Sequence, residues 1–122
     1  RRMFSAIGRV YTLPARLIEA ESAVVGSGPA YAAMFIEALA DGGVKVGLPR
    51  GQAVTYAAQM VLGAAAMVLE SGKHPGQLKD EVCSPGGSTI AGVAALEERG
   101  FRSAAIQAVE AAFRRNQELG KV

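Results

Sequence analysis

Val82-Cys83-Ser84-Pro85-Gly86-Gly87-Ser88-Thr89-Ile90 is the stretch around which the rest of the chain is organised. It holds one proline, two glycines and three hydroxyl residues directly before a run that predicts a helix. A turn of this composition can direct backbone N–H groups and hydroxyls at one point, and the helix N-terminus behind it adds a partial positive charge. The stretch therefore suits a small anion. It is also typical of an ordinary helix cap, which the residues alone slightly favour.

The composition indicates one globular domain. The chain has 122 residues, of which 50% are hydrophobic and 20% charged, so we expect a packed core rather than disorder. Its 13 basic and 11 acidic residues give a net charge of +2, and no basic cluster is larger than Arg1-Arg2 or Arg114-Arg115. This balance argues against a nucleic-acid partner.

The single cysteine and the single histidine restrict the chemistry. Cys83 alone cannot form an internal disulfide, and with His74 it cannot complete the usual four-ligand metal sets, so we expect no metal site. The opening Arg1-Arg2-Met3-Phe4 lacks the apolar core of a signal peptide. We therefore expect a cytoplasmic protein.

Residues 51–69 carry no charged side chain and approach the length of a membrane span. They are built mainly from Ala and Gly, with Gln52, Thr55 and Gln59 among them, rather than from Leu, Ile and Phe. Such a helix more often lies among other helices, so we expect no membrane span. Because 122 residues can hardly surround it, burial by a second subunit is expected.

The remaining pattern predicts an all-α domain of five to seven helices. Apolar residues at three- and four-residue spacing, ended by Gly or Pro, predict helices at residues 15–25, 30–46, 51–69, 75–82, 90–98 and 101–119. Residues 9–13 alternate like a short strand that has no partner in the chain. Gly42-Gly43 and Gly63 lie inside helices, where each glycine costs about 1 kcal/mol, so we expect close backbone packing there.

Three short motifs have weak functional interpretations. Val24-Val25-Gly26-Ser27-Gly28 resembles the start of a dinucleotide fingerprint, but Tyr31 occupies the third glycine position, so a turn between helices is favoured. Gly72-Lys73 lacks the other residues of a phosphate loop. Cys83 with His74 could form a nucleophile pair, although a half-buried structural cysteine explains Cys83 better.

The order of the motifs carries a resemblance to a known family. In sequence they are GSGPAY at residues 26–31, EALADGGVKVGLP at 37–49, HPGQLKD at 74–80, SPGGSTI at 84–90 and GFRS at 100–103. With this order and spacing, essentially the whole chain resembles the C-terminal half of pyrroline-5-carboxylate reductase.

That resemblance implies reduction of 1-pyrroline-5-carboxylate to L-proline with NADPH or NADH. It implies that residues 14–122 form a helical dimerisation and substrate-binding domain, and that residues 1–13 are the end of a nucleotide-binding Rossmann domain not included here. It also implies an interlocked homodimer, with decamers in the full-length enzyme. We expect the isolated chain to be inactive, because the missing domain would bind most of the cofactor.

The resemblance also implies roles for the opening stretch. The substrate carboxylate would be bound by the loop formed by Ser84, Pro85, Gly86, Gly87 and Ser88. The loop would use its backbone N–H groups, which proline lacks, and the Ser84 hydroxyl. Thr89 would be the catalytic residue, hydrogen-bonded to the ring nitrogen as an orienting donor or relay. A threonine hydroxyl is too weak an acid to be the ultimate proton source.

The chain departs from the family pattern at four places. Pro14-Ala15 replaces an acidic residue at the start of the first helix, Glu21-Ser22 replaces a common Val-Thr, and Val25 replaces a serine. Gly72 stands where some relatives have an acidic residue near the substrate. These departures put side contacts to the substrate in doubt and leave residues 84–89 unaffected.

Two other hypotheses stay open on the sequence. The chain could be a helical oligomerisation module without enzymatic function, or the helical domain of another imine or hydroxyacid reductase. Neither hypothesis explains the order of the motifs as well as the reductase family does.

Overall fold

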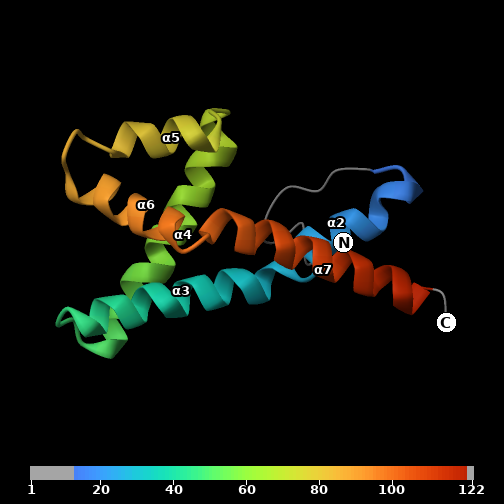
Figure 1. Cartoon of the computed structure of the whole chain (residues 1–122), viewed down its shortest axis with the longest axis horizontal. Coiled ribbons are helices and arrows are strands. Elements are labelled where there is room, and N and C mark those ends of the chain that lie inside the picture. The colour runs from blue at the N-terminus through green and yellow to red at the C-terminus, as the bar shows by residue number, and fades with distance from the viewer. Residues whose placement is uncertain (1–12, 121–122) are drawn as a thin grey trace. The chain divides into compact units, whose positions relative to one another are not determined.

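The computed structural model describes residues 13–120, which are helical and contain no strand (Figure 1). The elements are the 3-10 helix η1 (Ala15–Leu17) and the α-helices α2 (Ile18–Val25), α3 (Gly28–Lys45), α4 (Arg50–Ser71), α5 (Pro75–Val82), α6 (Ser88–Glu98) and α7 (Phe101–Gly120). The predicted all-α class and helix number are confirmed. The strand expected at residues 9–13 falls almost wholly outside the described residues.

Glycine and histidine set the helix ends around α4 and α5. Gly72 follows α4 with φ of 70°, a left-handed conformation that strains any side-chain-bearing residue. His74 precedes α5, and its Nδ1 accepts a hydrogen bond from the Gly76 N–H at 2.9 Å. The backbone therefore explains a glycine at position 72, and the His74 side chain caps α5.

The start of α6 corrects one expectation. The sequence predicted a helix from residue 90, whereas α6 begins at Ser88 and includes Thr89 in its first turn. Ser and Thr favour positions just outside a helix, which is why the sequence pointed to a later start. Here Gly87 occupies the N-cap position, so both hydroxyl residues lie one step further along, inside the helix.

The chain divides into two compact units. Among the described residues, the first comprises 13–28 and 107–120, and the second comprises 29–106. In the first unit η1 leads into α2, whose Ala23 is fully buried. The last part of α7 carries an ion pair between Glu110 and Arg114, with 3.2 Å between Oε1 and Nη2. That exposed pair contributes a few tenths of a kcal/mol at most.

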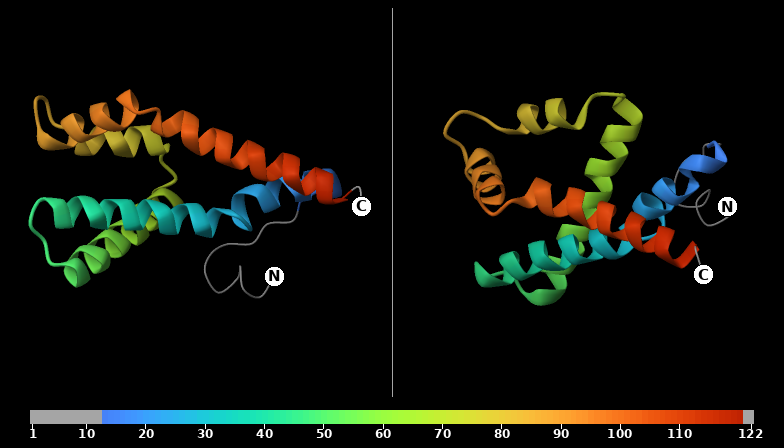
Figure 2. Two further views of the ribbon diagram at one scale, coloured as in Figure 1. Left: turned by 60° about the horizontal axis from the view of Figure 1, so that its bottom comes forward. Right: turned by 45° about the vertical axis from the view of Figure 1, so that its right-hand side comes forward.

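Within the second unit, α3 and α4 approach closely at the turn that joins them (Figure 2). A Cβ atom added to Gly43 would lie 3.4 Å from the Cβ of Ala53 and 3.1 Å from Cδ1 of Leu48. Beside this point Ala40, Ala53 and Ala57 form a buried cluster. The close packing expected at Gly43 is confirmed, whereas no atom lies within 4 Å of the corresponding positions at Gly42 and Gly63.

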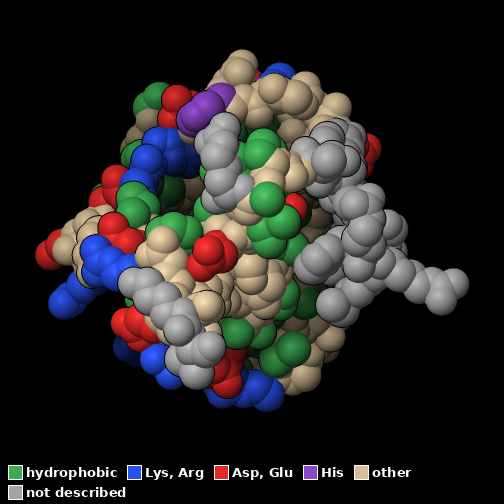
Figure 3. Space-filling view, turned by 90° about the vertical axis from the view of Figure 1, so that its right-hand side faces the viewer, with side chains coloured by type: hydrophobic (Ala, Val, Ile, Leu, Met, Phe, Trp, Pro, Cys, Tyr) green, Lys and Arg blue, Asp and Glu red, His purple; other side chains and the backbone are tan. Residues whose placement is uncertain are grey.

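The described part of the chain has almost no core of its own. Its buried hydrophobic residues are Ala23, Ala40, Ala53 and Ala57, and no large side chain is fully buried. Hydrophobic side chains lie open at the surface instead, as Figure 3 shows for one face. Alanine contributes little apolar area, so these helices lack the burial that normally stabilises a domain.

The helix α4 shows this shortage most clearly, because it exposes large apolar side chains on two roughly opposite sides. At 100° per residue, Tyr56 and Met60 lie on one side and Leu62 and Leu69 lie roughly opposite. All four are exposed, with Leu62 64% exposed and Tyr56 57% exposed. A helix of this kind needs protein on both of these sides, which favours an interlocked second copy over packing on a flat surface.

Two segments, Ile18–Lys45 and Arg50–Ser71, are long and apolar enough to cross a membrane by length and composition alone. Against that interpretation, α4 carries the amide of Gln52 in its first turn and that of Gln59 near its centre. Hydrocarbon offers these amides no partner. Small residues make up about half of the rest of α4, as suits close packing against protein. Burial by a second copy therefore stays the favoured prediction.

Leu62→Glu tests this prediction. The wild-type chain is expected to have the mass of two chains by light scattering in detergent-free buffer. A carboxylate at position 62 would have to be desolvated in the interface, so the variant should associate at least tenfold more weakly and lose helix content by circular dichroism. Leu62→Met keeps the apolar volume and is the control. Equal dimerisation by the two variants would contradict the prediction.

Candidate functional site

The stretch between α5 and α6 forms a tight turn. The Ser84 carbonyl accepts a hydrogen bond from the Gly87 N–H at 3.1 Å, with Pro85 and Gly86 between them. Gly86 has φ of 70°, which is the value that the third residue of a type II turn requires. Proline at the second position fixes φ in advance, so the sequence Ser-Pro-Gly-Gly predisposes the chain to this conformation.

The turn delivers the chain to the N-terminus of α6. Gly87 is the N-cap residue, with φ of −85° and ψ of 178°, and it has no side chain to accept a hydrogen bond. Within residues 13–120 no partner is found for the backbone N–H groups of Ser88, Thr89 and Ile90. No acidic side chain lies in this first helical turn. The helix therefore presents three free donors and a partial positive charge.

The Ser84 side chain lies against this helix start. A Cβ atom added to Gly87 would come within 2.6 Å of Ser84 Oγ and 3.3 Å of the Ser84 carbonyl oxygen. Glycine at position 87 therefore lets the Ser84 hydroxyl fold back toward α6. The sequence pattern identified both residues but gave no sign of this contact.

The predicted site residues are accessible. Ser84, Pro85, Gly86, Ser88 and Thr89 are exposed and Gly87 is half-buried. Together they offer hydroxyls and N–H groups but no titratable side chain. The arrangement can bind and orient a small anion, and it contains no general base.

The neighbouring titratable residues do not complete a catalytic pair. Cys83 is half-buried, as predicted, and follows α5, whereas His74 precedes it. An eight-residue helix separates them by about 12 Å. Within residues 13–120 no group of three His, Cys, Asp or Glu residues is placed to hold a metal ion.

Comparison with known proteins decides the family. Residues 15–119 match the family model described as pyrroline-5-carboxylate reductase dimerisation. The chain belongs to the pyrroline-5-carboxylate reductase dimerisation family. The resemblance to this family that the sequence motifs indicated is thereby confirmed.

Individual members of the family show the extent of the match. The chain is 60% identical to pyrroline-5-carboxylate reductase of Synechocystis sp., covering 99% of this chain and 45% of that protein. It is 54% identical to the pyrroline-5-carboxylate reductase of Pisum sativum, and the match covers 97% of this chain and 43% of that protein. The crystal structure of Plasmodium falciparum pyrroline carboxylate reductase with NADP bound matches this chain with a TM-score of 0.88 and 36% identity. The match covers 98% of this chain and 48% of that one. The chain thus spans less than half the length of these relatives.

In this dimerisation family member, the glycine turn at residues 26–28 does not fit a dinucleotide. It joins α2 to α3, and the Gly26 N–H donates to the Ser22 carbonyl at 2.8 Å, continuing the helical pattern. A dinucleotide turn follows a strand, and residues 13–120 contain none. The predicted turn between two helices is confirmed, and Gly72-Lys73 lies at the C-terminal end of α4.

The turn geometry predicts that Gly86→Ala is destabilising. A side chain at φ of 70° costs about 1 to 2 kcal/mol, so chemical unfolding should show a loss of that size. Gly92→Ala is the matched control within α6, because a Cβ there meets no atom within 4 Å and alanine is the better helix former. Its stability should be unchanged or higher. If Gly86→Ala is as stable as Gly92→Ala, the turn is not the one described.

Proposed function

We propose that this chain is the dimerisation and substrate-binding part of an enzyme that reduces 1-pyrroline-5-carboxylate to L-proline with NADPH or NADH. The observation that carries the proposal is the type II turn with three free N–H groups at residues 88–90, in a chain of this family. The relatives named pyrroline-5-carboxylate reductase match almost all of it.

The turn and the helix start bind the substrate carboxylate in this proposal. Donors are the free N–H groups at the start of α6 and the Ser84 hydroxyl, which lies against Gly87. Hydrogen bonds to a charged acceptor are roughly twice as strong as neutral ones, and the helix N-terminus adds its own attraction. Because α6 has no acidic residue in its first turn, nothing there repels the carboxylate.

Thr89 contacts the ring nitrogen of the substrate. It lies in the first turn of α6 and its side chain is exposed, within reach of a ligand held at the same helix end. Its hydroxyl orients the C=N bond and stabilises the nitrogen as it gains a proton. The proton comes ultimately from the solvent, with the Thr89 hydroxyl as an orienting donor or relay.

We propose that a separate nucleotide-binding domain holds NADPH or NADH, and that this chain alone is inactive. The cofactor, when bound, supplies the hydride. Residues 1–13 are proposed to be the end of that domain and residues 14–122 the helical domain.

A homodimer is the proposed assembly, because α4 exposes apolar residues on two opposite sides and the family is one of dimerisation domains. Further assembly into decamers and a cytoplasmic location complete the proposal. The single cysteine suits a reducing compartment. No membrane or nucleic-acid partner is proposed.

Replacement of Thr89 tests the mechanism. In the complete reductase containing this chain, Thr89→Ala should lower kcat more than tenfold, because the ring nitrogen loses its orienting donor. Thr89→Ser keeps the hydroxyl and should retain most of the rate. Steady-state NADPH oxidation with pyrroline-5-carboxylate measures both. An unchanged rate in the alanine variant would remove Thr89 from the mechanism, and a wild-type enzyme without activity would contradict the proposed function.

A further inference from the structure

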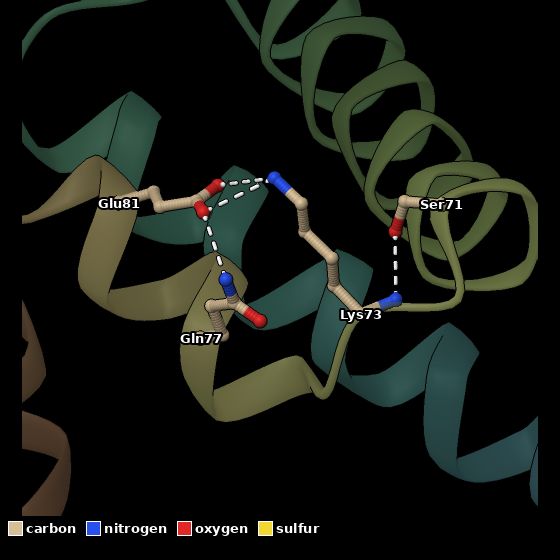
Figure 4. Close-up of polar contacts among 4 residues, drawn as sticks. All are labelled: Ser71, Lys73, Gln77 and Glu81. Carbon is tan, nitrogen blue, oxygen red and sulfur yellow. Dashed lines mark hydrogen bonds and ion pairs between the residues drawn. The ribbon is translucent and has the colours of Figure 1, made fainter.

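The turn between α4 and α5 is crossed by a polar network that the function described above does not use (Figure 4). Lys73 Nζ lies 3.1 Å from Oε2 and 3.4 Å from Oε1 of Glu81. Gln77 Nε2 donates to the same Oε2 at 3.4 Å. At the other end, the Lys73 N–H donates to Ser71 Oγ at 3.1 Å. The last residue of α4 is thus linked through Lys73 to the last turn of α5.

Helix stability does not explain where these two charges lie. Lys73 precedes the N-terminus of α5 and Glu81 lies at its C-terminus, which are the ends where the helix dipole disfavours a cation and an anion respectively. Neutral residues at both positions would suit α5 better, although Lys73 also follows the C-terminus of α4, where a cation is favoured. The pair therefore offsets an unfavourable placement at α5 and connects this helix to the end of α4.

That connection matters because apolar packing does little to hold α5. The helix has no buried residue. A surface hollow lies between α5 and the facing α6. It is lined by Lys79 of α5 and by Val93 and Leu96 of α6. The direction of α5 relative to α4 therefore depends strongly on the polar contacts at the α4–α5 turn, including the His74 cap.

The candidate site lies directly after this helix. Glu81 is three residues before Ser84, whose carbonyl closes the type II turn. A change in the direction of α5 would move the turn relative to α4. We propose that Lys73 and Glu81 are positioning residues, whose ion pair fixes α5 and thereby places residues 84–89 for the substrate. The inference rests on the proposed function of that stretch.

Glu81→Gln is the most direct test, because it removes the charge and keeps an acceptor for Gln77. Both partners are about half exposed, with side chains 44% and 46% accessible, and such pairs change equilibria by a factor of up to about five. In the complete reductase, KM for pyrroline-5-carboxylate should rise about two- to fivefold with kcat nearly unchanged. The melting temperature should stay equal or rise, because the C-terminus of α5 loses an unfavourable anion.

Asp80→Asn is the matched control. Its carboxylate pairs with the adjacent Lys79 at 3.2 Å and does not reach across the turn, so KM should not change. The exchanged pair Lys73→Glu with Glu81→Lys should restore KM to near the wild-type value, whereas each of those single variants raises it. A double variant as impaired as the single ones would overturn the inference. Equal KM values for Glu81→Gln and Asp80→Asn would do so too, as would a KM increase that accompanies a lower melting temperature.

Hydrogen exchange of the chain itself separates this inference from the proposed function. The hydrogen-bonded amides of Cys83 and Gly87 should exchange faster in Glu81→Gln than in Asp80→Asn. Equal exchange in the two variants overturns the inference, whatever the enzyme does. A wild-type reductase that does not act on pyrroline-5-carboxylate contradicts the proposed function, while faster exchange in Glu81→Gln would still show that the ion pair orders this turn.

Discussion

The exposed apolar side chains on two opposite sides of α4 are the constraint on which the rest of the structure depends. Exposed Tyr56 and Met60 lie roughly opposite exposed Leu62 and Leu69, so no single neighbouring surface can cover the helix. Burying a large apolar side chain contributes about 1.5 to 3 kcal/mol, and a single chain leaves most of that unrealised along α4. The fold therefore makes sense as one part of an assembly.

Small residues let such helices approach one another. Within the chain, Gly43 and Ala53 allow the close contact of α3 with α4, where a Cβ on Gly43 would be 3.4 Å from that of Ala53. Gly42 and Gly63 have open space beside them. A second copy offers a physical reason for these two glycines, because its backbone could occupy that space.

How much the sequence predicts differs between the fold and the site. Glycine and proline mark the helix ends by mechanisms that act locally, which is why the boundaries of α3 and α4 were predicted within about two residues. The start of α6 was likewise predicted two residues late, because the type II turn moves the cap to Gly87, and only the geometry shows this. The residues of the candidate site were found from motif order, whereas their ligand contacts stay predictions.

Contacts across turns could not be predicted from the sequence. Lys73 and Glu81 are eight positions apart with one of them outside the helix, so no helical spacing rule joins them. The same holds for the ion pair of Asp41 with Arg50 across the α3–α4 turn, and for the contact of Ser84 Oγ with Gly87. Such contacts follow from the direction of the chain after a turn, which local propensity does not specify.

Hydrogen exchange along α4 tests the central claim most directly. The purified chain would be compared in detergent-free buffer at high concentration and at a concentration below its dissociation constant. The account predicts strong protection of the amides in α4 in the concentrated sample and loss of that protection on dilution, because a second copy covers the helix. Protection that is independent of concentration, or the absence of protection in both samples, would contradict it.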